Sequence, residues 1–506
     1  ACEVRDGWPG DHRLVALRVG VASGALRGPG CWTFPLPLLG DAAFCEALQQ
    51  AMEQWQQSHP CSPTRTAADQ WEGLKLFVRE HAVAHCRRAA RDRRRADTEL
   101  HAQLDAAARE VAAHPGCAQR LAAFTDLQRQ LQQRALAAAR KAAHFAGVLW
   151  DDYGEASTFW FHRLGKQRRA DTAIAVLADT LAPPVGAAPD GSPVYDTVTL
   201  RTLQGVQRAG EVLASFYDGQ AEGGLFHPQA TDAAAQQHVL GCIDRRLSHG
   251  DALVCDAPLT ADDLHDALKR CARGKRPGRD GLPYEFYAAF WDVVGELLTR
   301  VCNEALEAGG LGLLPSSMRE GLIVLLFKAG DRTLPRNYRP ITLLCCDYKL
   351  LAKALSLRFA APLARVLDVT QTAFLPDRWI GDNVLFHLEE VEYLEAVQKP
   401  GCILFCDFEK AYDRMDRGWL VQCMRALGFG ARAVAWVELL MRGTTARCMY
   451  NGWRTRAFPV LSGVAQGSPL SPLLYVAAAQ PLAALCRSLL AQRAFTPIVL
   501  PDGTPV

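Results

Sequence analysis

The chain has 506 residues, of which 49% are hydrophobic. This length exceeds one ordinary hydrophobic core, and this apolar content excludes a largely disordered polypeptide, so we expect two to four folded units. The formal net charge of +2, from 56 basic and 54 acidic residues, excludes a uniformly basic surface, so that only local clusters of charge bear on nucleic-acid binding.

The 17 cysteines are scattered, and they form neither a C-x-x-C pair nor a Cys/His cluster with the spacing of a zinc site. A disulfide scaffold is therefore not expected, and the pattern fits a reducing intracellular compartment, the cytoplasm and nucleus. The sequence shows no signal peptide, and no apolar run reaches the length that crosses a bilayer. We expect a soluble protein with no membrane partner.

The N-terminal half reads as a short strand followed by a helical connector. Alternation over residues 14–19 predicts a strand, and two prolines within Gly30–Asp41 exclude regular structure before a helix begins near Asp41. From Asp41 to Leu149, alanine, glutamine, arginine and leucine at helical spacing predict long helices. No strict heptad persists, which favours a helical hairpin, or packing against a neighbouring domain, over a coiled coil.

Two clusters of basic residues interrupt the balanced charge. The first is typical of the solvated face of a helix. The second lies beside a Pro-Gly turn, which favours contact with phosphate. The clusters comprise Arg87, Arg88, Arg91, Arg93, Arg94 and Arg95, and Lys269, Arg270, Arg273, Lys275, Arg276 and Arg279.

Turn signals and a change of pattern divide the rest of the chain. Pro, Gly and Asp-Gly within residues 181–195 predict a loop or hairpin, and a boundary is expected between residues 230 and 255. Beyond it, helices alternate with short apolar strands, which predicts an α+β domain from residue 255 to 506. The expected helices are 262–273 and 286–308, and the expected strands are 321–327, 403–408 and 447–450.

One apolar run delivers a carboxylate at its end. In GCILFCDFEKAYDRMD, the predicted strand Ile403–Phe408 would hold Asp407 at the tip of a buried strand. Nucleotidyl transfer by two metal ions requires carboxylates held rigidly in such a place, because Mg²⁺ prefers hard oxygen ligands. A single Asp after a strand is more often structural, so the pattern around it decides.

The segment D-F-E-K-A-Y-D, Asp407–Asp413, is similar to the D-x-x-K-A-F/Y-D segment of reverse transcriptases of non-LTR, LINE-type retrotransposons. The resemblance implies that Asp407 is catalytic and binds the metal, Mg²⁺ or Mn²⁺, together with the backbone of Phe408. It also implies that Tyr412 is a steric gate that selects deoxynucleotides. A ring that packs under the strand is the alternative for Tyr412, and the two interpretations are compatible.

The segment Gly463–Pro472, GVAQGSPLSP, follows an Asn451–Gly452 turn between two strand-like stretches. Its glycines permit a close backbone approach, and its Ser-Pro pairs introduce a helix, so that a tight loop feeds a helix. The segment resembles the G-V-x-Q-G-S-P-L-S-P loop of the same family. The resemblance implies that Gln466 and Gly467 bind the incoming nucleotide.

An upstream block, F-K-A-G-D-R-T-L-P-R-N-Y-R-P-I, resembles the F-K-x-G-D…N-Y-R-P-I block of the family. Basic side chains at such a turn neutralise phosphate charge, Arg bidentately. The resemblance assigns Lys328 and Arg339 to the phosphates of the nucleotide. Contact with the template backbone and solvation of a helix remain equal alternatives for Lys349, Lys353 and Arg358.

Two further blocks, Gly274–Trp291 and Gln371–Val384, resemble segments of LINE-type enzymes that retroviral enzymes lack in this form. They imply nucleic-acid contacts at Lys275, Arg276 and Arg378. Ala373 departs from the family pattern, which has Gly there. Together the blocks imply the fingers and part of the palm of a right-hand polymerase over residues 255–506.

The first residues resemble the end of an apurinic-type endonuclease. P-G-D-H-R-L-V contains Asp11 and His12, which match the Asp-His of the family's S-D-H motif, although Gly10 stands where Ser is usual. The implied organisation is a remnant of an endonuclease/exonuclease/phosphatase-like domain at 1–20, a mostly helical connector at 21–254, and an incomplete reverse transcriptase at 255–506.

The sequence contains no aromatic-Ala-Asp-Asp motif, which supplies the second catalytic carboxylates of the family. We therefore expect a retrotransposon RNA-directed DNA polymerase that adds dNTPs to a DNA primer on an RNA template, truncated before that motif and inactive as given. The alternative is a non-catalytic nucleic-acid-binding protein derived from a retroelement. An unrelated α+β enzyme is disfavoured by five family-like blocks in the correct order.

Overall fold

The structure is a computed structural model. By its internal contacts the chain divides into two compact units, Ala1–Ala25 with Arg79–Ala175 and Leu26–Val78 with Val176–Val506. This division does not follow the predicted boundaries at residues 20 and 254, which stay predictions. The residues described are 2–5, 14–17, 24–62, 64–114, 116–145, 173–309, 312–398, 400–494 and 498–499.

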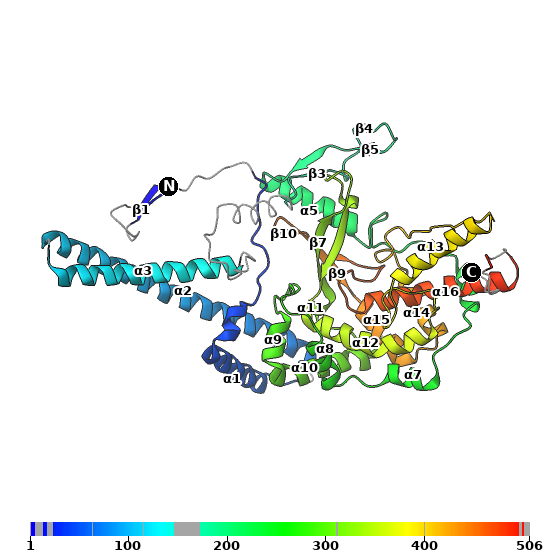
Figure 1. The fold of residues 1–506 in the computed structure, drawn as a ribbon. Coiled ribbons are helices and arrows are strands. Elements are labelled where there is room, and N and C mark those ends of the chain that lie inside the picture. Colours follow the sequence, from blue (N-terminus) through cyan, green and yellow to red (C-terminus); the bar gives the residue numbers. More distant parts are fainter. Residues whose placement is uncertain are drawn as a thin grey trace. The chain divides into compact units, whose positions relative to one another are not determined.

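The first unit contains a strand pair and a helical hairpin. An ion pair of 3.2 Å between Arg134 and Asp97 joins the two helices, which run side by side (Figure 1), and Leu100 and Leu104 are buried. The hairpin expected from the alanine-rich pattern is therefore present. The elements are β1 (Cys2–Arg5) and β2 (Leu14–Leu17), paired antiparallel, the part of α2 (Ala67–Ala113) from Arg79 onward, and α3 (Ala118–Phe145).

The second unit is built around a mixed sheet in the order β10-β9-β7-β8, with β11 also paired to β9. The central pair, β7 and β9, is parallel, and β8 pairs antiparallel with β7. The sheet and its helices confirm the α+β class, and the strands expected at 321–327 and 447–450 are present. The strands are β7 (Glu320–Phe327), β8 (Tyr338–Leu343), β9 (Thr445–Tyr450), β10 (Trp453–Arg454) and β11 (Phe458–Pro459).

Two hairpins form at the turn signals of the sequence. Asn451 and Gly452 have φ values of 48° and 85°, the left-handed conformation that a two-residue turn needs, and they connect β9 to β10. Gly191, with φ 80°, lies between β4 and β5. The smaller strand pairs are β3 (Val176–Ala178) with β6 (Thr197–Thr199), and β4 (Gly186–Ala187) with β5 (Pro193–Val194).

The helices of the second unit begin largely where capping residues predict. The Asp41 carboxylate accepts from Phe44 N and begins α1, and Thr260 with Asp263 forms a capping box at the start of α8. The helix expected over 286–308 is interrupted at Phe290. The helices, besides the start of α2, are α1 (Ala42–Ser58), α5 (Leu203–Tyr217), α6 (Ala233–Gly241), α7 (His249–Asp256), α8 (Ala261–Lys269), α9 (Tyr284–Ala289), α10 (Trp291–Glu307), α11 (Ser316–Arg319), α12 (Cys346–Val366), α13 (Gly381–Ala396), α14 (Arg417–Ala426), α15 (Ala431–Met441), α16 (Ser471–Ala491), and the 3-10 turns Leu36–Gly40 and Pro335–Asn337.

One helix corrects an expectation about apolar runs. By length and composition alone, α16 is long and apolar enough to cross a membrane, although we expected no apolar run of that length. In the structure α16 packs against α14, where the indole nitrogen of Trp419 donates to the carbonyl of Ala478 at 3.0 Å. Its apolar length therefore serves, at least in part, to cover a neighbouring helix.

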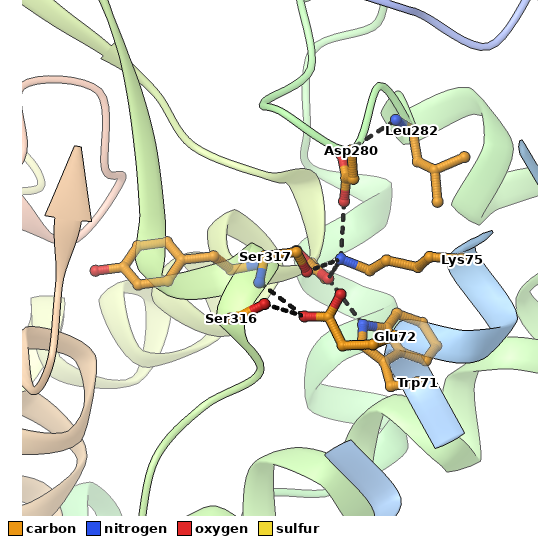
Figure 2. A network of polar contacts seen from close by, with 9 residues as sticks. Trp71, Glu72, Lys75, Asp280, Leu282, Ser316 and Ser317 are labelled. Atoms are coloured by element: carbon orange, nitrogen blue, oxygen red, sulfur yellow. Dashed lines mark hydrogen bonds and ion pairs between the residues drawn. The ribbon is translucent and has the colours of Figure 1, made fainter. Parts of the chain in front are cut away.

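A buried ammonium group joins the start of α2 to the rest of the second unit (Figure 2). Nζ of Lys75 lies 2.8 Å from Asp280 Oδ2 and 2.7 Å from Ser317 Oγ, and it forms an ion pair with Asp347. Trp71 Nε1 donates to the same Asp347 oxygen at 2.9 Å. The two carboxylates come from the loop before α9 and from α12, so one ammonium ties three segments together.

The electrostatics of this cluster favour the charged lysine. Burial by itself lowers the pKa of Lys75, but the Asp280 and Asp347 carboxylates outweigh it and hold that pKa well above its usual range. The side chain of Asp347 is fully buried, and those of Lys75 and Asp280 are nearly so. Removing the ammonium therefore leaves two carboxylates buried without their counter-ion.

Replacing Lys75 by Met is expected to lower the free energy of unfolding by about 3–5 kcal/mol, the usual cost of leaving a buried ion pair with one partner. Urea denaturation of the 506-residue chain, followed by tryptophan fluorescence, measures this loss. Lys269→Met is the control, because that side chain is exposed and pairs at the surface with Asp266, where pairs contribute at most about 1 kcal/mol. Equal effects of the two substitutions would contradict the prediction.

Candidate functional site

The Gly463–Ser468 loop is fixed to its neighbours by backbone hydrogen bonds. Gly463 N donates to Met415 O at 2.7 Å, Val464 N donates to Tyr412 O at 2.8 Å, and Thr342 N on β8 donates to Gln466 O at 2.8 Å. The loop therefore lies between the turn that follows Asp407 and the sheet. Two segments that are about fifty residues apart in the sequence are thus brought into contact.

Both glycines of the loop are required, because other backbone atoms approach them closely. Gly463 has φ 77°, and a Cβ atom there would lie 2.4 Å from Asp413 O. Gly467 has φ 134°, and a Cβ atom there would lie 2.3 Å from Thr342 O. Any side chain at either position is strained and displaces backbone, so the glycine spacing seen in the sequence has a direct structural cause.

The turn and the loop share one buried pair of polar side chains. Nε2 of Gln466 donates to both carboxylate oxygens of Asp413, at 2.9 and 3.0 Å. Asp413 is 3% exposed as a whole residue, and Ser462 Oγ donates to its backbone carbonyl at 3.1 Å. Asp413 therefore fixes the orientation of the Gln466 amide.

Burial raises the pKa of Asp413 to about 6, although Lys410, the hydrogen bond from Gln466, and Arg414 all act to lower it. Its carboxyl group thus titrates close to neutral pH. Sequence reasoning assigned no role to this residue, even though it is the last Asp of the D-F-E-K-A-Y-D segment. Its position in the motif was the signal that could have identified it, since its burial cannot be inferred from the sequence.

An aromatic pair lies beside this carboxylate. The rings of Tyr412 and Tyr475 stack with centroids 5.1 Å apart and planes within 11°. Burial, and then the negative charge of Asp407, raise the pKa of Tyr475, so Asp407 is close to this pair. The structure therefore brings Asp407, Tyr412 and Gln466 to one region, as the sequence suggested, and adds Asp413 and Tyr475.

The strand expected at Ile403–Phe408 is absent, which corrects the sequence prediction. Residues 401–408 form no regular structure, and Leu404, Phe405 and Phe408 are 82%, 80% and 59% exposed. A strand needs a partner for its backbone groups, and no described segment pairs with this one. Asp407 is consequently an exposed residue of an irregular segment and not the tip of a buried strand.

A pocket lies behind the loop, next to the Asp413–Gln466 pair. Arg417 on α14 lines it and donates to Gly463 O at 3.0 Å, Met441 O at 2.8 Å and Thr444 Oγ1 at 3.2 Å. Burial lowers the pKa of Arg417 to about 10. This arginine, which the sequence did not single out, fastens the loop to the end of α15. Other lining residues are Ile323, Tyr348, Leu440, Ser462, Val464 and Leu474.

Four of the predicted basic residues are exposed. Lys328 and Arg339 lie on the β7–β8 hairpin, and Lys275 and Arg276 lie in the loop before α9. Because Arg339 faces Leu326 in the register and side chains alternate along a strand, Lys328 and Arg339 point to the same face of the hairpin. Lys353 is half-buried.

Three other predicted contacts are buried or engaged within the fold, and their nucleic-acid roles stay predictions. Nζ of Lys349, 9% exposed, lies 5.0 Å from the Tyr284 ring centroid. Arg358 donates to Asp263 at 2.9 Å and to two backbone carbonyls. Arg378 donates to four backbone carbonyls at and after the end of α12. Positive charge alone did not reveal that these side chains serve packing and capping.

The predicted endonuclease residues Asp11 and His12 lie outside the described residues. Within the described part of the chain, one cluster of metal-type ligands occurs, formed by Asp280, Cys345 and Asp347. The Lys75 ammonium already lies between the two carboxylates (Figure 2). Burial also raises the pKa of the Cys345 thiol well above its usual value, so it stays protonated and a poor ligand. These features favour a structural ion pair there.

Comparison with known proteins identifies the region around the loop. A family described as reverse transcriptase (RNA-dependent DNA polymerase) matches residues 328–493. The chain is 29% identical over 487 residues to the Transposon TX1 uncharacterized 149 kDa protein of Xenopus laevis, covering 94% of this chain and 34% of that protein. It is 26% identical over 217 residues to the Pol polyprotein of the type-2 retrotransposable element R2DM of Drosophila melanogaster, covering 43% and 20%.

A third relative is the RNA-directed DNA polymerase from mobile element jockey of Drosophila melanogaster, 24% identical over 226 residues, with 43% of this chain and 24% of that protein covered. The chain thus spans about a third or less of the length of these three relatives. The matches confirm the resemblance to LINE-type reverse transcriptases that the motifs indicated. The endonuclease remnant stays a prediction.

Asp413→Asn is expected to remove a pH dependence of stability. Because the folded pKa of Asp413 is raised, the folded state holds a proton that the unfolded state releases, and stability falls as the pH rises from about 4 to 6. The shift from 3.8 to about 6 corresponds to about 3 kcal/mol. Urea unfolding at pH 4 and pH 7.5 measures the fall, which Asp413→Asn should abolish. The exposed Asp262→Asn should retain it, and an unchanged fall in Asp413→Asn would contradict the assignment.

Proposed function

We propose that the chain contributes the nucleotide-binding part of an RNA-directed DNA polymerase, because residues 328–493 match the reverse transcriptase family and the chain is similar to proteins of transposable elements. The reaction is the transfer of a deoxynucleotide onto a DNA primer paired to an RNA template. The fingers are the β7–β8 hairpin, and the palm residues present are those around Asp407 and the loop.

The observation that carries this proposal is the Asp413–Gln466 pair. A glutamine that binds a nucleotide must present its amide in one orientation, and a buried carboxylate that accepts from Nε2 provides that orientation. The loop backbone on which Gln466 lies is itself hydrogen-bonded to β8 and to the Tyr412–Met415 turn. The nucleotide would therefore meet a preorganised amide beside the Tyr412 ring, which would act as the steric gate.

Lys328 and Arg339 are proposed to bind the phosphates of the nucleotide. Both are exposed on one face of the β7–β8 hairpin. Water therefore solvates both cations while no nucleotide is bound, and together they can neutralise the charge of a triphosphate. Arg339 offers a planar fork that matches two phosphate oxygens, whereas Lys328 acts as a point charge.

Asp407 and the Phe408 carbonyl are the groups that would hold Mg²⁺ or Mn²⁺. They are hard oxygen donors, which fits these ions, and Asp407 is exposed and close to Tyr475. When bound, a divalent ion supplies charge neutralisation at the reacting phosphate. Asp413 is not available as a second ligand while both of its oxygens accept from Gln466. Asp407 is then the one carboxylate of the described site that is placed to bind a metal, so these residues by themselves are proposed not to hold the two ions that primer extension requires.

Loss of the contact between Gln466 and the nucleotide is expected to weaken nucleotide binding. With a dideoxy-terminated DNA primer on an RNA template and Mg²⁺ present, Gln466→Ala should weaken dATP or dTTP binding by about tenfold, the worth of roughly one hydrogen bond. Calorimetric titration of the correct nucleotide measures the change. Gln492→Ala at the end of α16 is the matched control, since among the described residues its side-chain amide bonds to Ser488 alone. Unchanged affinity in Gln466→Ala would overturn the proposed function.

The Tyr412 ring is expected to set the sugar preference. In the same titration, Tyr412→Val should reduce the ratio of dNTP to rNTP affinity by about tenfold, because the space of the 2′-hydroxyl is opened. Tyr412→Phe keeps the ring and its stacking on Tyr475 and should retain the ratio. A ring that only packs would leave the ratio unchanged in both variants, while stability would fall in Tyr412→Val.

A further inference from the structure

Five arginines form a continuous stripe along α2 in the first unit. The members of this arginine stripe are Arg87, Arg88, Arg91, Arg94 and Arg95. At 100° per residue, they fall within an arc of about 120° on the helix, over a length of about 12 Å. All five side chains are exposed. Arg93, the sixth member of the basic cluster, lies outside this arc.

The stripe faces away from the partner helix. Leu100 and Leu104 are buried and Asp97 pairs with Arg134 of α3, so these residues mark the face of α2 that contacts α3. The same helical geometry puts the centre of the stripe about 150° from the centre of that face. Its guanidinium groups therefore do not contribute to the packing of the hairpin.

Among the residues that the structure describes, four of the five stripe arginines form no ion pair with a carboxylate, whereas three arginines of α3 do. Arg120, Arg129 and Arg134 pair with Glu110, Asp126 and Asp97 at 2.8, 2.9 and 3.2 Å. Within the described part of the chain, the stripe has one ion pair, between the exposed Arg95 and Glu99, and such a surface pair is readily exchanged. Positive charge thus collects here in a chain that is nearly balanced overall.

We propose that the arginine stripe binds the phosphate backbone of a nucleic acid. Arginine forks match phosphate oxygens bidentately, and a length of about 12 Å spans roughly three to four phosphates of one duplex strand. An anionic membrane is disfavoured, because a helix that lies on lipid needs large apolar residues beside its basic face, and residues 87–99 of α2 contain none. The inference rests on the proposed function only in that a polymerase must handle template, primer or target strands.

The test removes three charges from the stripe and three from elsewhere on the same hairpin. The first variant of the 506-residue chain carries Arg87→Gln, Arg88→Gln and Arg91→Gln, and the control carries Arg120→Gln, Arg129→Gln and Arg134→Gln. Glutamine keeps helix propensity, and circular dichroism checks the fold of both. Fluorescence anisotropy with labelled single-stranded RNA, an RNA–DNA hybrid and duplex DNA, each from 50 to 200 mM salt, gives the affinity and its salt dependence.

The stripe variant is expected to bind about tenfold more weakly at 50 mM salt, and the slope of log affinity on log salt should shrink by about 2 for single-stranded RNA, as for three lost phosphate contacts. The control should keep the wild-type slope. The probe that shows the loss identifies RNA or DNA as the ligand.

The other outcomes are distinguishable. If wild type binds nucleic acid and the stripe variant binds equally well, the inference about the stripe is wrong while the proposed function stands. If both triple variants lose affinity equally, the loss reflects the lower total positive charge, and the inference about the stripe is again wrong. If wild type binds none of the three probes, the stripe inference and the proposed function both fail.

Discussion

The Lys75 ammonium, held between Asp280 and Asp347, decides how the second unit is assembled. It comes from a helix far earlier in the sequence than either carboxylate, and it fixes the start of α2 to the loop before α9 and to α12. Two buried carboxylates this close repel each other unless a cation lies between them. The position of α12, and with it the β8–α12 connection beside the loop, thus depends on one lysine more than 200 residues upstream.

A second buried carboxylate, Asp413, organises the site itself. Its carboxylate oxygens accept from the neutral Gln466 amide and, in the part of the chain that the structure describes, form no ion pair of the kind that Lys75 makes, and burial raises its pKa. The difference between the two clusters is functional in our proposal. A full ion pair locks segments together permanently, whereas an amide facing a carboxylate that titrates near neutral pH orients a side chain that must still engage a ligand.

Particular residues show how far the sequence could be interpreted. The glycines at 463 and 467, the Asn451–Gly452 turn and the Asp41 cap follow local rules, and each lies where those rules put it. The region of Asp407, Tyr412 and Gln466 was also predictable, because a family motif carries its own geometry. Asp413 was overlooked, and the strand at Ile403–Phe408 was wrong, because a strand requires a partner that an apolar run within one segment cannot reveal.

The sequence by itself therefore determined local conformation, namely helix starts and tight turns. It also determined which family motifs are present. Only the tertiary structure decided which charged side chains have partners within the fold and which remain available to a ligand. Arg358 and Arg378 look like nucleic-acid ligands in the sequence and donate in the structure to backbone carbonyls and Asp263. The arginine stripe looks like an ordinary solvated face in the sequence, and among the described residues it forms one ion pair, that of Arg95 with Glu99. The physical reason is that the effect of a charge is set by burial and by partners distant in the chain.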